Sequence, residues 1–244
     1  MQSVLEIQQT DAVEVRDDRE LLITEEQVSD LQRAQAPKGV YCAVKRILDV
    51  ILSFCGLAVL LLPLALVALW VYIDDPGKVF FVHDRVGKGG RLFKLYKFRT
   101  MKMDTPKNMA TMDVEDPDRY ITRAGRILRK LSVDELPQLF NVLRGDMSLV
   151  GPRPLIPQEE DIHTMRHRFG VYAVRPGVTG LAQINGRDLV SPAEKVRYDV
   201  RYVEDFGFKL DAKILFATVP KLFGGEGVVE GYDSREAAEE EVAV

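Results

Sequence analysis

The sequence predicts an α+β protein, mainly helical, in which a membrane helix near the N-terminus precedes a cytosolic domain with amphipathic helices and a small β-element. Three observations predict this class. Residues Val50–Ile73 form a run of 24 residues without a charge. The segment "RLFKLYKFRT" alternates polar and apolar residues, which is typical of a strand. Beyond Pro157, apolar residues recur at helical spacing.

Both ends of the chain are acidic. Residues 1–40 carry nine Asp or Glu against four Lys or Arg, and residues 231–244 carry five acids against one arginine. This composition is typical of solvated extensions, and we expect no nucleic acid among the partners of the chain. The predicted organisation is therefore a polar N-terminal extension (1–40), a membrane helix (41–75), a cytosolic membrane-associated domain (76–230) and an acidic tail (231–244).

The uncharged run is long enough to meet a bilayer. As a straight helix its 24 residues would measure roughly 36 Å, more than the hydrocarbon core requires. Pro63 lies near its middle, where the missing N–H and the ring break the hydrogen-bond ladder and bend the helix. Each half is too short to cross alone, so the segment either crosses with a kink or enters and returns to the same face.

The charges on either side of the run favour the re-entrant alternative. Lys45 and Arg46 precede it, and from Arg85 to Lys102 there are seven Lys or Arg and no acid. Basic flanks prefer the cytoplasm, and a single crossing cannot place both of them there. We therefore predict a re-entrant helix broken at Pro63, with the domain on the cytoplasmic face.

The elements after the membrane helix follow from local patterns. Residues 75–77 (Asp-Pro-Gly) predict a turn, and glycines 87, 89 and 90 predict the loop of a β-hairpin. Residues 120–130 predict a helix with a basic face, in which Arg129 lies off that face and beside Asp134. The segment "QEEDIHTMRHRF" predicts a helix, "VRPGVTGLAQINGR" a glycine-rich loop, and the remainder two amphipathic helices separated at Gly207.

The adjacent acids Asp134 and Glu135 are the most informative pair. They can be a helix N-terminus that is capped by Ser132, with the carboxylates complementing the helix dipole. Alternatively, one acid faces a pocket while its neighbour braces it or helps to hold a cation such as Mg²⁺. Arg153 in "GPRP" and Arg175 in "VRPGVTG" favour the second interpretation, because stiff flanking backbone suits an arginine that clamps phosphate. Together these residues predict attack on a diphosphate at a membrane surface.

Four segments, "KRILDV", "KLYKFRTM", "GRILRKLSVDELPQLFNVLRGDMSLVGPRP" and "VRPGVTGLAQINGRD", resemble the bacterial sugar transferases, small monotopic phosphoglycosyl transferases. The resemblance covers about Lys45 to Phe223. It implies Mg²⁺-dependent transfer of a sugar-1-phosphate from a UDP-sugar to undecaprenyl phosphate, with release of UMP, on the cytoplasmic face of the bacterial inner membrane. This would be the first membrane step of polysaccharide assembly.

The resemblance also implies residue roles. Asp134 would be the nucleophile that forms a phosphosugar-aspartate intermediate, and Glu135 would support it, both near the metal. The implied substrate-binding residues are Lys97, Arg99, Arg129, Pro152, Arg153, Arg175 and Gln183. The chain departs from the family at the membrane break, which usually reads Ser-Pro and here reads Leu62-Pro63. That change removes a hydroxyl that could satisfy a freed carbonyl.

Other functions stay open at this point. A glycosyltransferase that moves the sugar alone would release UDP, and a non-catalytic membrane scaffold would release neither nucleotide. The segment "DTPKNMATMD" resembles a subgroup that uses N-acetylated deoxysugars on UDP, but the sugar and the pathway are not fixed by the sequence. A homodimer is also left open.

Overall fold

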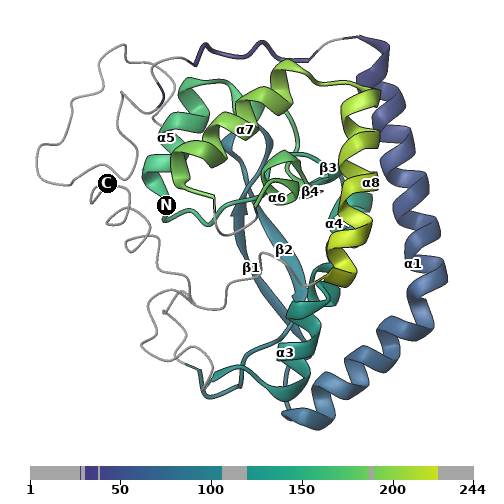
Figure 1. The fold of residues 1–244 in the computed structure, drawn as a ribbon. Coiled ribbons are helices and arrows are strands. Elements are labelled where there is room, and N and C mark those ends of the chain that lie inside the picture. The colour runs from purple at the N-terminus through teal and green to yellow at the C-terminus, as the bar shows by residue number, and fades with distance from the viewer. Residues whose placement is uncertain (1–27, 29–30, 38, 106–119, 187–189, 225–244) are drawn as a thin grey trace, which may run out of the picture.

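The computed structural model describes residues 28, 31–37, 39–105, 120–186 and 190–224. It confirms the predicted fold class: a long apolar helix precedes shorter helices and little β-structure (Figure 1). The elements in chain order are α1 (Val40–Asp74), β1 (Phe80–Val86), the 3₁₀ turn η2 (Lys88–Gly90), β2 (Leu92–Phe98), α3 (Arg123–Lys130), the 3₁₀ turn η4 (Val133–Glu135), α4 (Gln138–Arg144), β3 (Ser148–Val150), α5 (Glu160–Arg168), the 3₁₀ turn η5 (Val171–Ala173), β4 (Gly177–Thr179), α6 (Leu181–Ile184), α7 (Pro192–Glu204) and α8 (Phe208–Gly224).

The helix α1 is continuous over 35 residues and contains Pro63. It bends partway along its length instead of separating into two helices (Figure 1). Among the described residues it is the one helix that is long and apolar enough to cross a membrane. Its apolar side chains are largely uncovered by protein, with Val59, Leu61 and Leu62 each at least 70% exposed. A surface of this kind requires lipid, so α1 is a membrane helix.

Both ends of α1 pack on the rest of the protein. In the first half, Lys45, Asp49 and Ser53 form a buried stripe at a spacing of four residues. In the second half, Val71 packs with Phe98 of β2 and Leu128 of α3. The two ends of the membrane helix are therefore fixed on one folded body.

The predicted hairpin is confirmed. Strands β1 and β2 pair antiparallel, from Phe80 opposite Phe98 to Val86 opposite Leu92. Gly89 and Gly90 have φ values of 68° and 73°, which a glycine adopts without the strain that a Cβ would cause. Asn141 of α4 fixes the hairpin from the other side, because Tyr96 N donates to its Oδ1 and its Nδ2 donates to Lys94 O.

The main core lies between α5, α7, α8 and β3. It includes part of the predicted N-terminal extension: Val28 is 1% exposed, and Ala34 N donates a hydrogen bond to Phe169 O. Residues 1–27 of the extension, the acidic tail and most of the segment "DTPKNMATMD" lie outside the described residues. The buried members of the core are Val28, Ala34, Val150, Leu155, Ile162, Met165, Phe169, Val171, Val174, Ala193, Val196, Val200, Tyr202, Val203 and Ile214.

A second, parallel pair of strands was not predicted. Ser148 of β3 lies opposite Gly177 of β4, and Val150 lies opposite Thr179. The loops around the pair touch backbone to backbone: a Cβ on Gly177 would lie 2.1 Å from Gly151 N, and one on Gly151 would lie 2.4 Å from Arg175 O. These glycines therefore allow the "GPRP" and "VRPG" loops to pack against each other.

Candidate active site

The adjacent acids lie on the 3₁₀ turn η4 between α3 and α4. Ser132 takes the left-handed conformation at φ 53°, and its side chain makes no capping hydrogen bond. The interpretation of Ser132 as a helix cap is therefore wrong, because the chain reverses at this residue and α4 begins only at Gln138. Asp134 is 7% exposed, whereas Glu135 is less buried and pairs with Arg153 at 2.9 Å. One turn thus holds one buried acid and one acid that is already braced.

The environment of Asp134 combines burial with positive charge. Burial raises the pKa of Asp134 to about 6, and the neighbouring Glu135 carboxylate adds to the rise. The positive charges of Lys97, Arg129 and Arg153 act in the opposite direction. Asp134 is therefore largely ionised at pH 7, while burial leaves its carboxylate poorly solvated by water. Such a carboxylate is available as a nucleophile.

Lys97 of β2 is the first cation to act on that carboxylate. Burial lowers the pKa of Lys97 to about 8, although the negative charge of Asp134 opposes the fall. Its ammonium group also lies 5.4 Å from the centre of the Phe81 ring, directly across the hairpin. Lys97 is thus mostly protonated at pH 7, and it loses its proton as the pH rises through about 8.

Two arginines complete the cationic surroundings of Asp134. Arg129, near the end of α3, donates from Nε to Thr100 Oγ1 at 2.9 Å. Arg153 is exposed at 46% of its side chain, and its Nη2 lies 2.9 Å from Glu135 Oε1. Four residues that sequence reasoning assigned to the site are therefore brought together around Asp134: Glu135, Lys97, Arg129 and Arg153.

The backbone carbonyl of Arg153 accepts a hydrogen bond from a buried ion pair. Arg166 of α5 donates from Nη1 to the backbone carbonyl of Arg153 at 2.8 Å, and from Nη2 to Asp199 of α7. The side chains of Arg166 and Asp199 are only 4% and 2% exposed. A buried pair of this kind is costly to break, so it holds the "GPRP" backbone firmly.

Two residues of β1 also belong to this region, and sequence reasoning missed them. Arg85 donates from Nη1 to Pro154 O and from Nε to His83 Nε2, both at 3.2 Å. Burial and then the charge of Arg153 lower the pKa of Arg85 to about 10, and burial with the charge of Arg85 lowers that of His83 to about 3. The sequence did hold a signal for them. Side chains alternate between the two faces of a strand, so residues 81, 83 and 85 lie on the face that carries Lys97.

Comparison with known proteins identifies the family. The model of the family described as "Bacterial sugar transferase" matches residues 40–225. The chain belongs to the bacterial sugar transferase family. It is 44% identical over 191 residues to the uncharacterized sugar transferase EpsL of Bacillus subtilis, an alignment that covers 76% of this chain and 90% of that protein.

Two relatives are named for an activity. The UDP-N-acetylgalactosamine-undecaprenyl-phosphate N-acetylgalactosaminephosphotransferase of Aeromonas hydrophila is 38% identical over 197 residues, which is 78% of this chain and 46% of that protein. The UDP-glucose:undecaprenyl-phosphate glucose-1-phosphate transferase of Caulobacter vibrioides is 40% identical over 187 residues, which is 73% of this chain and 69% of that protein. These names support an enzyme of the phosphoglycosyl transferase type.

Three other residues that were predicted to bind substrate form hydrogen bonds within the transferase itself. Arg99 is 6% exposed and donates from Nη1 to Asp75 Oδ2 at 2.6 Å, so it fixes the end of α1 to β2. Pro152 is buried and its carbonyl accepts from Gly177 N at 2.9 Å. Gln183 donates to Val178 O at 3.2 Å. Their predicted contacts with substrate stay predictions, and the geometry gives each of them a role in holding the loops.

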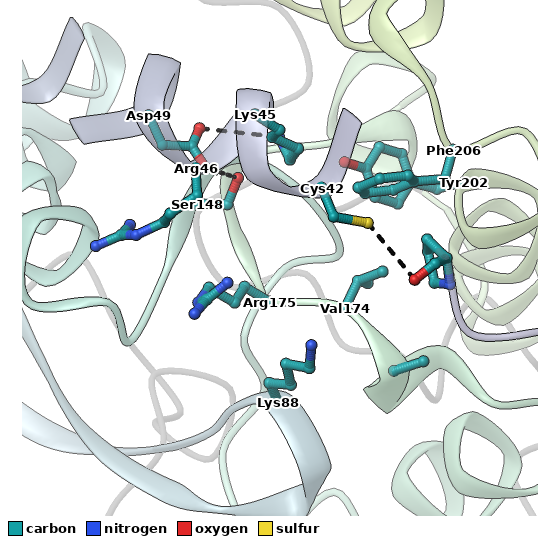
Figure 2. A pocket seen from close by; sticks show the side chains of 12 residues that line it. Cys42, Lys45, Arg46, Asp49, Lys88, Ser148, Val174, Arg175, Tyr202 and Phe206 are labelled. Atoms are coloured by element: carbon teal, nitrogen blue, oxygen red, sulfur yellow. Dashed lines mark hydrogen bonds and ion pairs between the residues drawn. The ribbon is translucent and has the colours of Figure 1, made fainter. Parts of the chain in front are cut away.

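Arg175 lies at a different place in the transferase. Its Nε donates to Gly145 O at 2.9 Å, just beyond the end of α4, whereas Asp134 precedes the start of that helix. The seven residues of α4 separate the two ends by roughly 10 Å. Arg175 instead lines a pocket with Arg46 and Lys88 (Figure 2). The predicted contact of Arg175 with a substrate phosphate therefore stays a prediction.

The site fits a divalent cation in one particular way. Asp134 and Glu135 supply carboxylate oxygens on a single turn, and no group of three His, Cys, Asp or Glu side chains gathers within the described part of the chain. Mg²⁺ commonly binds one or two carboxylates and takes its other ligands from water and substrate phosphates. Two adjacent carboxylates are compatible with that mode, and the predicted Mg²⁺ stays a prediction.

Proposed function

We propose that the transferase moves a sugar-1-phosphate from a UDP-sugar to undecaprenyl phosphate and releases UMP, through a covalent intermediate on Asp134. The observation that carries this proposal is the buried carboxylate of Asp134 beside the cations Lys97, Arg129 and Arg153. A carboxylate that attacks a diphosphate needs the charge of the phosphate oxygens to be neutralised, and these cations are placed to do so. The named relatives support the same donor and acceptor classes.

The reaction then takes two displacements at the same phosphorus. A carboxylate oxygen of Asp134 attacks the β-phosphorus, the bond from this phosphorus to the bridging oxygen breaks, and UMP leaves with that oxygen. A phosphate oxygen of undecaprenyl phosphate next attacks the same phosphorus, and the bond to Asp134 breaks with return of the free carboxylate. The soluble nucleotide thus departs before the lipid reacts, which suits a site that serves two very different substrates.

The other side chains act by position and charge. Glu135 and Arg153 hold each other, which places the positive charge of Arg153 beside Asp134, where it acts on a bound phosphate. Mg²⁺, held by Asp134 and Glu135 together with the diphosphate, would supply further neutralisation of the phosphate oxygens. The acceptor needs no general base, because a phosphate monoester is largely ionised at neutral pH.

The proposal includes the position of the enzyme at the membrane. The end groups of α1 bind one body: Asp49 accepts from Ser148 Oγ at 2.8 Å, and Asp74 accepts from Ala124 N at 2.9 Å. A helix that crossed the bilayer would carry one of these ends to the opposite face, about 30 Å away. With basic residues at both flanks, this arrangement supports a re-entrant helix and a catalytic domain on the cytoplasmic face of the inner membrane.

The decisive experiment omits the acceptor. A panel of UDP-sugars, including N-acetylated deoxysugars, first identifies the donor by UMP release in the presence of undecaprenyl phosphate and Mg²⁺. The enzyme is then mixed with that donor and Mg²⁺ alone. We expect a burst of UMP equal to the enzyme present and a sugar-phosphate mass increment on the peptide that contains Asp134. Asp134→Asn should abolish both, whereas Glu135→Gln should slow turnover and leave the site of attachment unchanged.

The same experiment separates the alternatives. Release of UDP instead of UMP would identify a glycosyltransferase that moves the sugar alone. Release of neither nucleotide with any donor would favour a scaffold. Normal turnover with acceptor, but no burst and no adduct without it, would replace the covalent mechanism by direct transfer.

A further inference from the structure

The pocket in Figure 2 lies outside the region of Asp134. Its basic residues come from segments far apart in the chain: Arg46 from α1, Lys88 from the hairpin turn and Arg175 from the loop before β4. In the figure these three side chains gather on one side of the pocket, and Tyr202 and Phe206 lie on the other. We call it the basic pocket.

The basic pocket holds an excess of positive charge. Arg46 donates to Val142 O and Leu143 O, and Arg175 to Gly145 O, so both guanidinium groups bind carbonyls at the end of α4. Within the described part of the chain, neither arginine nor Lys88 has a carboxylate within ion-pair distance. Burial and then the repulsion from Arg175 lower the pKa of Arg46. An anion would relieve that repulsion.

The one carboxylate that lines the basic pocket is already engaged. Asp49 accepts from Ser148 Oγ at 2.8 Å and from Leu149 N at 3.1 Å. Lys45, which also lines it, lies 2.7 Å from Asp211 and 3.8 Å from Asp49. The internal pairs therefore leave Arg46, Lys88 and Arg175 as the surplus, and the pocket is an anion site by charge.

The size of the basic pocket limits the anion. Its volume is about 60 Å³, which is close to the share of two water molecules in the liquid. Sites for drug-sized ligands commonly measure about 300–1,000 Å³. The pocket can therefore receive a single small charged group such as a phosphate, but not the whole of a sugar nucleotide.

The position of the basic pocket identifies the source of the phosphate. Arg46 lies four residues before Val50, where the uncharged run of α1 begins, so it is roughly 6 Å from the hydrocarbon region along the helix. The headgroup layer on each face of a bilayer is about as thick. Basic pockets at the base of membrane helices bind anionic headgroups in this layer.

We propose that the basic pocket binds the phosphodiester of an anionic phospholipid, separately from the site at Asp134. The exposed Lys88 reaches it from the hairpin turn, while Arg46 and Arg175 meet it from α1 and the β4 loop. Because Arg46 and Arg175 also hold the end of α4, a bound lipid fixes α1, α4 and the "VRPG" loop together at the membrane surface.

Cys42 gives a direct probe, because it lines the basic pocket and the sequence has only one further cysteine, Cys55. The full-length Cys55→Ser enzyme is placed in phosphatidylcholine vesicles with or without phosphatidylglycerol, and the rate of Cys42 modification by uncharged N-ethylmaleimide is measured. We expect phosphatidylglycerol to slow the modification. Lys88→Gln should raise the phosphatidylglycerol content needed for protection by about five-fold, the effect of one basic residue at a membrane surface.

Two control variants and two soluble probes complete the test. Lys88→Arg, which keeps the charge, and Lys102→Gln, which removes an exposed charge elsewhere, should both keep the protection of the unaltered enzyme. Equal protection in Lys88→Gln, or no protection by phosphatidylglycerol in any variant, would overturn the proposal. Protection by UMP or inorganic phosphate in phosphatidylcholine vesicles, at least as strong as that by phosphatidylglycerol, would overturn the lipid assignment and make the pocket a soluble-phosphate site.

Discussion

At the scale of single residues, burial shifts the pKa values of an acid and a base toward each other. Desolvation raises the pKa of Asp134 to about 6 and lowers that of Lys97 to about 8. The carboxylate form of Asp134 grows as pH rises through 6, and the ammonium form of Lys97 is lost as pH rises through 8. Both groups carry the charges that the proposed attack needs only between these values.

This pair predicts a bell-shaped pH dependence for the UMP burst measured without acceptor, with limbs near pH 6 and pH 8. Omitting the acceptor matters because a phosphate monoester itself titrates near pH 6. Lys97→Arg should move the alkaline limb upward, since a guanidinium stays protonated, and should leave the acidic limb in place. The rate of the burst as a function of pH checks both. An alkaline limb that stays near pH 8 in Lys97→Arg would assign that limb to another group.

At the scale of elements, the "GPRP" loop is held from several directions. Arg85 of β1 donates to Pro154 O, and Arg166 of α5 donates to Arg153 O while it pairs with Asp199 of α7. Strand β3, which leads into the loop, is fixed to α1 through Asp49. The position of the Arg153 guanidinium thus depends on α1, β1, α5 and α7 as well as on its own loop.

Arg166→Lys tests this dependence, because one ammonium group cannot hold both Asp199 and Arg153 O in the geometry of a guanidinium. We expect a loss of about 1.5–3 kcal/mol, or roughly ten- to a hundred-fold in kcat/KM. Arg153→Lys should lose a similar amount, and the double variant little more than either single one. Arg168→Lys, on an exposed position of the same helix, is the matched control and should be near neutral. Additive losses in kcat/KM would mean that Arg166 acts on overall stability and not through Arg153.

At the scale of the whole molecule, α1 is a bent helix that is fixed to the catalytic body at both ends and covered by protein over little of its apolar surface. Other apolar side chains are also exposed: Ile127 of α3, Leu131 directly after that helix, and Phe216 of α8. The body therefore presents apolar surface beyond α1, as expected of a domain that lies on a bilayer.

Cysteine labelling tests the resulting topology. In a background without Cys42 and Cys55, single cysteines are placed on the two sides of α1 in the chain. One replaces Gln35, which precedes α1, and the other replaces Lys94, which follows it and has a side chain that is 59% exposed. Both should resist a membrane-impermeant thiol reagent in intact cells and react once the cells are permeabilised. Reaction of one of the two in intact cells would show that α1 crosses the membrane.

The sequence predicted the elements better than the contacts between them. The apolar run, the alternating hairpin and the helical spacing predict α1, β1, β2, α5, α7 and α8, and the resemblance brought Asp134 together with Lys97, Arg129 and Arg153. Short extended pieces were expected in the glycine-rich segment that contains β4, but its parallel pairing with β3 was not predicted, because each strand has only three residues and the two are far apart in the sequence. The partners of Arg99 and Arg175 are an aspartate and a carbonyl distant in sequence, and no local pattern encodes such pairs.

The buried charges near the start of α1 bind residues that are synthesised much later. Asp49 binds Ser148, which is synthesised 99 residues later, and Lys45 binds Asp211, which comes later still. At about 5–20 residues per second, Asp49 is translated roughly 5 to 20 seconds before Ser148. During that interval Lys45 and Asp49 have only each other and water to offset their charges, which favours a position outside the hydrocarbon for the start of α1. We therefore expect the start of α1 to stay at the membrane surface until its partners in the catalytic body are made.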